Sequence, residues 1–358
     1  MDINELLTMA VQRGASDIHL KVPARPILRI HGELILLEEY PELTSELIQR
    51  MLQDITTDVQ RKSFYDRWEL DFSYSIADVG RFRVNACMQR GSVALALRTV
   101  PIHVTPLAQL GMPDVCRTLA TKPNGMVLVT GATGSGKSTT LAGMIDHINE
   151  TERRHIVTIE DPIEFLHTDK NSIIAQREIG ADTTSYPEAL RHVLRQDPDV
   201  ILIGEMRDLE TISTAITAAE TGHLVLATLH TTSAPQTIDR IIDVFPPEQQ
   251  GQIRLQLSVA LEGVITMTLL PRAAGQGRVA AVETLIVTSA VRNLIREGKT
   301  FQISNLMQMG AQYGSQTMDQ ALKSLVDRRL VAPEDALARA SNSEELRRLL
   351  QGAVTGAR

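Results

Sequence analysis

The chain has 358 residues and a formal net charge of −7, from 36 Lys and Arg against 43 Asp and Glu. At about 150 residues per domain, this length predicts two or three domains. Two cysteines exclude a disulfide framework and a four-cysteine zinc site. The acidic balance and an aromatic content of 3% argue against nucleic acid as a partner.

The start of the chain has no basic segment followed by an apolar run, so we expect no signal peptide. No stretch is long and apolar enough to span a bilayer. These two features predict a cytoplasmic protein, whose contact with a membrane would be peripheral and made through a partner.

The first hundred residues alternate short helix-like and strand-like segments, which predicts a small α+β domain built on an antiparallel sheet. Helices are expected over residues 3–13 and 44–54, the second with Thr44 or Ser45 as its N-cap. Strands are expected over residues 17–20, 26–30, 33–36, 70–74, 80–85 and 93–98. A cluster of prolines and a glycine then predicts a linker over residues 101–113.

After the linker, four short apolar runs alternate with helical stretches over residues 114–270. The runs cover residues 126–129, 155–159, 200–203 and 224–227. Because they are apolar on both faces, they predict a parallel sheet covered by helices on both sides. Residues 271–358 are expected to be a helical C-terminal region, with apolar side chains at helical spacing in segments 291–297, 318–329, 333–340 and 343–350.

Residues 131–138 read Gly-Ala-Thr-Gly-Ser-Gly-Lys-Ser and match the phosphate-binding loop pattern in full. The loop follows a strand-like run and opens a helix-like one over residues 139–149, which is the context the motif requires. Lys137 would reach the β- and γ-phosphates of ATP, and Ser138 would ligate Mg²⁺. The residues expected to bind the nucleotide are Thr133, Gly134, Ser135, Gly136, Lys137, Ser138 and Thr139.

Ionisable side chains follow the other three apolar runs, where an open α/β sheet binds its ligand. They are Glu160, Asp161 and Glu164 after the second run, Glu205 after the third and His230 after the fourth. Carboxylates in these places can hold Mg²⁺ or orient the attacking water. Alternatively, Glu160 and Asp161 could cap a helix or brace a loop, and His230 and the nearby His223 could be structural.

These segments together resemble the secretion and type IV pilus ATPases. Residues 159–164 resemble the acidic box of that family, residues 197–208 its Walker B segment, and residues 221–231 its histidine box. The resemblance runs from about residue 3 to beyond residue 320. It implies a fold of class α/β, in which a RecA-like P-loop NTPase domain follows a PAS-like α+β domain of residues 1–100 and precedes the helical C-terminal region. It also implies a homohexameric ring.

Within the family, the retraction-type ATPases of twitching motility match best. The chain starts almost directly at the small domain, has no paired-cysteine zinc module, and resembles this group over residues 291–299. From the residues alone, segment 291–297 could equally be an ordinary amphipathic helix. A pilus-extension or type II secretion motor is the alternative function. A nucleic-acid translocating ATPase is a further alternative, which the acidic charge disfavours.

The resemblance also implies residue roles. Glu205 or Glu164 would polarise the attacking water, and both would organise Mg²⁺ with Ser138. Arg81, Arg83 and Arg98 would supply positive charge to the phosphates, although they could instead form a surface ion-pair ladder. ATP hydrolysis would pull pilin subunits out of the pilus base through a platform protein of the inner membrane, on whose cytoplasmic face the ring would dock.

Overall fold

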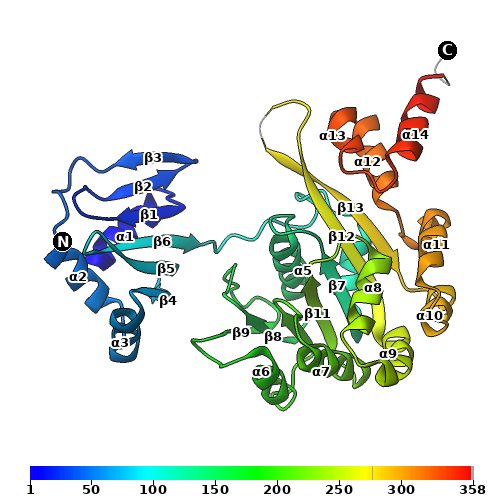
Figure 1. The fold of residues 1–358 in the computed structure, drawn as a ribbon, viewed down its shortest axis with the longest axis horizontal. Helices are drawn as coiled ribbons and strands as arrows, with labels where there is room; N and C mark the ends of the chain where they lie inside the picture. Colours follow the sequence, from blue (N-terminus) through cyan, green and yellow to red (C-terminus); the bar gives the residue numbers. More distant parts are fainter. Residues whose placement is uncertain (276, 356–358) are drawn as a thin grey trace. The chain divides into compact units, whose positions relative to one another are not determined.

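The computed structural model describes residues 1–275 and 277–355, with side chains up to residue 350. The contacts divide the chain into two compact units (Figure 1). The first unit comprises Met1–His103 and Glu164–Leu166, and the second comprises Val104–Ile163 and His167–Arg358. No helix in the described part of the chain has the length and apolar character that crossing a membrane requires.

The first unit contains an antiparallel sheet of six strands in the order β3-β2-β1-β6-β5-β4. The strands are β1 (Asp17–Leu20), β2 (Ile27–Ile30), β3 (Glu33–Leu36), β4 (Glu69–Ile76), β5 (Gly80–Gln89) and β6 (Ser92–Val100). The helices are α1 (Ile3–Gln12), α2 (Ser45–Asp54) and α3 (Asp58–Arg67). All of the strands and both helices expected here from the sequence are present, and Thr44 is the N-cap of α2.

Helix α3 is absent from the sequence prediction because its residues carry almost no apolar pattern. Only Phe64 of this helix is buried, and most of its other side chains are polar or charged. The available signal lies at its start, where Thr57 and Gln60 form a capping box. Caps can therefore reveal a helix that hydrophobic periodicity does not.

The second unit contains a mixed sheet of seven strands in the order β13-β12-β7-β11-β10-β8-β9. The strands are β7 (Gly125–Thr130), β8 (His155–Glu160), β9 (Ile173–Glu178), β10 (Val200–Ile203), β11 (Leu224–Leu229), β12 (Leu261–Pro271) and β13 (Arg278–Ile286). The four apolar runs expected as strands are β7, β8, β10 and β11, and they form one continuous parallel block. Their carboxyl ends therefore meet at one edge of the sheet.

Helices cover both faces of this sheet, as predicted. Met126 and Leu128 of β7 belong to a core shared with α6, α7, α8 and α9, whereas Val127 and Val129 pack with α4 and α5. Successive side chains of a strand point to opposite faces, so this alternation requires a layer on each side. The covering helices are α4 (Val115–Ala120), α5 (Lys137–Thr151), α6 (Tyr186–Val193), α7 (Leu209–Glu220), α8 (Ala234–Asp243) and α9 (Pro247–Ala260).

The expectation of a purely helical region after residue 270 is wrong for Arg278–Ile286, which forms β13. This strand pairs antiparallel with β12 over its whole length. It is a short, largely buried apolar run, and periodicity alone does not separate such a strand from a buried helix. The helical elements after it are α10 (Ser289–Arg296), α11 (Ile303–Met309), α12 (Met318–Asp327), α13 (Pro333–Leu337) and α14 (Ser343–Thr355), with short 3₁₀ turns at Thr300–Gln302 and Ala311–Tyr313.

One buried carboxylate fastens two helices to β13. Glu283 is 5% exposed, and its two oxygens accept hydrogen bonds from the first N–H groups of α8 and α12, at Ala234 (2.7 Å) and Met318 (3.1 Å). Burial raises the pKa of this carboxyl. Because a helix N-terminus attracts negative charge, Glu283 stabilises both helices at once.

Helix α10 carries the segment that resembles the retraction-type motif. Val291 and Ile295 are buried, as its apolar stripe predicts. Arg292 is not simply solvated, because it donates to the carbonyl of Ser258 (2.7 Å) and pairs with Glu262 (2.6 Å). This arginine therefore ties α10 to the end of α9 and the start of β12.

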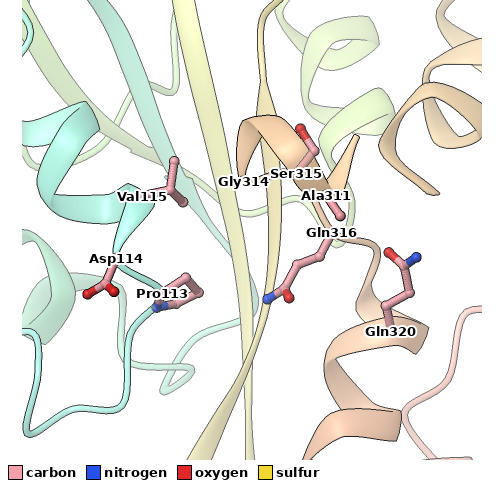
Figure 2. Close-up of a pocket in the computed structure, with 8 residues that line it drawn as sticks. All are labelled: Pro113, Asp114, Val115, Ala311, Gly314, Ser315, Gln316 and Gln320. Atoms are coloured by element: carbon pink, nitrogen blue, oxygen red, sulfur yellow. The ribbon is translucent and has the colours of Figure 1, made fainter. Parts of the chain in front are cut away.

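A cavity of about 440 Å³ lies in the second unit between the start of α4 and the segment from Ala311 to Gln320 (Figure 2). Polar side chains that line the cavity form hydrogen bonds within the fold. Ser315 Oγ accepts a hydrogen bond from the N–H of Ile286 (3.0 Å), and the amide of Gln316 donates to the carbonyl of Val282 (2.7 Å). These contacts explain why polar side chains line the cavity without invoking a ligand.

His167 makes the stability of the second unit sensitive to acid. Its Nδ1 is buried and has no hydrogen-bond partner among the described residues. Burial lowers the pKa of this histidine from 6.5 to about 4, with the charge of Asp146 acting in the opposite direction. The folded protein therefore holds the ring neutral, whereas the unfolded chain protonates it below pH 6.5.

We expect acid to destabilise the wild-type protein more than His167→Gln. The stability from the neutral ring is present above pH 6.5 and is lost as the pH falls towards 4, which amounts to about 2 kcal/mol between pH 7 and pH 5. Urea unfolding at these two pH values measures the difference. His103→Gln, at an exposed histidine, should follow the wild type. An equal loss in wild type and His167→Gln would contradict this origin of the acid sensitivity.

Candidate active site

The predicted phosphate-binding loop joins β7 to α5. Gly131, Gly134 and Gly136 have φ angles of 141°, 76° and 98°, in a region that residues with a Cβ rarely adopt. A Cβ on Gly131 would overlap the main-chain oxygen of Met267 in β12 and the hydroxyl of Ser135. Glycine is therefore required for the loop to turn this closely against the neighbouring strand.

The start of α5 offers a cradle for an anion. Gly136 is the N-cap and makes no side-chain cap, so Lys137, Ser138 and Thr139 are the first residues of the helix, where N–H groups lack helical acceptors. Ser135 Oγ is buried in the same loop and has no hydrogen-bond partner among the described residues. Phosphate oxygens would satisfy these donors, so the expected nucleotide-binding residues fit the group they are meant to hold.

Lys137 is folded into its own loop. It is 8% exposed, and its Nζ donates to the carbonyls of Gly131 (2.9 Å) and Ala132 (3.1 Å). Burial lowers the pKa of Lys137, and the negative charge of Glu205 opposes that shift. The ammonium group therefore lies within electrostatic reach of the glutamate that follows β10.

The side chain of Glu205, which follows β10, contacts residues that follow β10 and β11. One carboxylate oxygen accepts a hydrogen bond from Arg207 (2.6 Å), and the other lies 3.3 Å from Nε2 of His230. The bond from Arg207 lowers the pKa of Glu205 most and His230 adds to it, although burial acts in the opposite direction. Glu205 is therefore an ionised group. The structure brings together three of the expected site residues, Lys137, Glu205 and His230.

Two of the candidate residues instead brace the fold. A carboxylate oxygen of Glu160 accepts hydrogen bonds from Thr158 (2.7 Å) and Gln176 (3.2 Å) on the same sheet. Nδ1 of His223 lies 3.0 Å from the carbonyl of Ala218, near the end of α7. These contacts favour the structural interpretation of both residues.

Tyr186, the first residue of α6, is a neighbour of the site that the sequence does not reveal. Its hydroxyl lies 2.9 Å from the position that a Cβ on Gly204 would occupy, immediately before Glu205. Burial raises the pKa of Tyr186, and the negative charges of Asp161, Glu205 and Glu160 raise it further. Tyr186 does not follow a strand, so a search of strand ends could not find it.

The three candidate arginines lie on the sheet of the first unit. Arg81 and Arg83 alternate along β5 and share a face, and Arg83 is directly opposite Arg98 of β6. Arg83 pairs with Glu164 (2.9 Å), and Arg98 pairs with Asp17 of β1 (2.8 Å). These pairs fit the ion-pair ladder that the sequence left open.

Glu164 belongs by its contacts to the first unit, whereas Ser138 and Glu205 belong to the second. Neither unit by itself contains the whole expected metal group of Ser138, Glu164 and Glu205. No cluster of three or more His, Cys, Asp or Glu side chains within the described residues could hold a metal ion. Mg²⁺ at phosphoryl-transfer sites commonly takes one or two protein ligands together with phosphate oxygens, which Ser138 and Glu205 fit.

We expect Gly131→Ala to weaken ATP binding at least about tenfold, because the added Cβ forces the loop away from β12 and disrupts the cradle. Titration with a fluorescent ATP analogue measures the affinity, and thermal unfolding checks the fold. Gly251→Ala in α9 is the matched control, because nothing lies within 4 Å of its Cβ position. Wild-type affinity in Gly131→Ala would mean that the loop does not need this glycine.

Comparison with known proteins identifies the family of this chain. A model of the type II/IV secretion system protein family matches residues 1–338. The type IV pilus retractation ATPase PilT of Pseudomonas aeruginosa is 49% identical over 344 residues, which cover 96% of this chain and 99% of that protein. A twitching motility protein of Neisseria gonorrhoeae is 52% identical over 321 residues, which cover 90% of this chain and 86% of that protein.

A crystal structure of the pilus retraction motor PilT with bound ADP superposes with a TM-score of 0.89 at 49% identity, and the match covers 97% of this chain and 99% of that one. The chain thus has the α/β ATPase fold of the PilT-like secretion ATPases, with a mixed sheet. The chain belongs to the type II/IV secretion system protein family and, within it, to the PilT-like ATPases.

Proposed function

We propose that this protein hydrolyses ATP to power the retraction of type IV pili and thereby twitching motility. The observation that carries the proposal is the pairing of a complete phosphate-binding loop with Glu205 at the same edge of the sheet, where the charge of Glu205 acts on Lys137. Near full-length likeness to proteins named for pilus retraction and twitching supports the direction of force.

In the proposed reaction, the loop and the start of α5 bind the phosphates. Lys137 exchanges the carbonyls of Gly131 and Ala132 for oxygens of the β- and γ-phosphates. Ser138 and Glu205, with Glu164 as a further candidate, would hold Mg²⁺, which would neutralise charge on these phosphates.

A carboxylate then polarises the attacking water, and Glu205 or Glu164 is the candidate for this role. His230, which lies 3.3 Å from Glu205, would respond to the γ-phosphate. Arg81, Arg83 and Arg98 would bind phosphate oxygens, and Arg83 and Arg98 would give up their ion pairs to do so, because planar guanidinium groups stabilise charge on a transferring phosphoryl group. This last role rests on the family resemblance.

The family resemblance also supports the assembly that we propose. Six copies would form a ring at the cytoplasmic face of the inner membrane, docked on the platform protein of the pilus machine and acting indirectly on pilin. The first unit would be a PAS-like domain and the second a RecA-like domain, with domain boundaries near residues 100, 113 and 270. A net charge of −7 argues against nucleic acid as the cargo.

We expect Lys137→Ala and Glu205→Gln each to lower ATP turnover by about 100-fold or more, because each removes a charge at the phosphates or the water. Strains that carry either variant, or no copy of the gene, should keep or accumulate surface pili and lose twitching. Turnover of the purified proteins, pilus counts and motility measure these effects. Lys62→Ala and Glu248→Gln, at exposed positions outside the site, are the matched controls.

Three results would contradict the proposal in different ways. Loss of all surface pili would indicate an extension motor. Strong stimulation of ATP hydrolysis by DNA would indicate a translocating ATPase. Wild-type turnover in both variants would remove Lys137 and Glu205 from the active site.

A further inference from the structure

The hydroxyl of Tyr186 lies against the main chain that carries Glu205. A Cβ on Gly204 would lie 2.9 Å from this hydroxyl and 3.3 Å from Cα of Glu160. Glycine at position 204 is therefore what allows the tyrosine to approach the ends of β8 and β10 so closely. The Gly204 N–H also donates to the carbonyl of Ile159 (2.8 Å), which joins the same two strands.

The ring of Tyr186 is held by its surroundings. It packs against the hydrophobic core beneath α6 and α7. The start of α6 is fixed by Ser185, whose hydroxyl accepts from the N–H of Glu188, and by a proline in the first turn. The backbone and the ring thus leave the hydroxyl little freedom to move away from Gly204.

Several charged side chains surround the hydroxyl of Tyr186. The charges of Asp161, Glu205 and Glu160 act on it, and the guanidinium of Arg207 acts in the opposite sense. Within the described residues, no hydrogen bond occupies this hydroxyl, so its influence on the turn comes from its close packing against Gly204.

We propose that Tyr186 is a positioning residue of the ATPase reaction, which holds the Gly204–Glu205 turn and keeps the Glu205 carboxylate aimed at the phosphate edge. The inference rests on the proposed role of Glu205 in ATP hydrolysis. Tyr186 acts through that glutamate and contributes no group to the phosphates themselves.

The test is Tyr186→Phe, which keeps the ring and removes the hydroxyl, made in the full chain with and without Glu205→Gln. We expect kcat to fall about five- to tenfold in the single variant, because a small displacement of the Glu205 carboxylate slows the reaction, with KM and the thermal unfolding midpoint unchanged. In the Glu205→Gln background, the added substitution should change kcat less than about twofold, because residues that act as a unit are not additive.

Tyr313→Phe, at an exposed tyrosine of the same unit, is the matched control and should keep wild-type kcat. An unchanged kcat in Tyr186→Phe would overturn the inference, and so would an equal fold-loss in both backgrounds. A lower unfolding midpoint with wild-type kcat would mean that the hydroxyl only stabilises the fold. Wild-type turnover in Glu205→Gln alone would overturn the proposed role of Glu205 and the inference with it.

Discussion

The parallel pairing of β7, β11, β10 and β8 is the constraint on which the rest of the second unit depends. In this block, every strand ends at the same edge of the sheet, so residues that are far apart in the sequence come together there. Burial on both faces fixes the register, because a slip of one residue would exchange the two cores. The position of the phosphate-binding loop beside Glu205 and His230 follows from this pairing.

Charged side chains also meet at this edge of the sheet, and each needs an opposite charge or a hydrogen-bond partner. Lys137 is buried and depends on loop carbonyls and on the field of Glu205, while Glu205 depends on Arg207 and His230. Each of these contacts is one that bound phosphate could replace or reorganise. The site is therefore stable as a set of internal pairs, and its donors are of the kind that bind phosphate oxygens.

Local patterns predicted the parts of this structure that local chemistry determines. The four apolar runs, the glycine loop and the strand-end acids each carry their signal within a few residues. Helix α3 and strands β9, β12 and β13 were not predicted. Helix α3 has almost no apolar face, and the apolar run of β13 could equally form a buried helix. Tyr186 could not be predicted, since its nearness to Gly204 arises from packing between distant segments. The pairing of Arg98 with Asp17 likewise depends on the register between β1 and β6, which the sequence does not state.

The most direct measurement of whether this edge binds ATP is a crystal structure of the full chain with Mg²⁺ and a non-hydrolysable ATP analogue. We expect Nζ of Lys137 to leave the carbonyls of Gly131 and Ala132 and to bind a γ-phosphate oxygen, with Ser138 at the metal and Glu205 facing it. A nucleotide bound elsewhere, or bound here with Lys137 still on its own loop, would contradict this assignment.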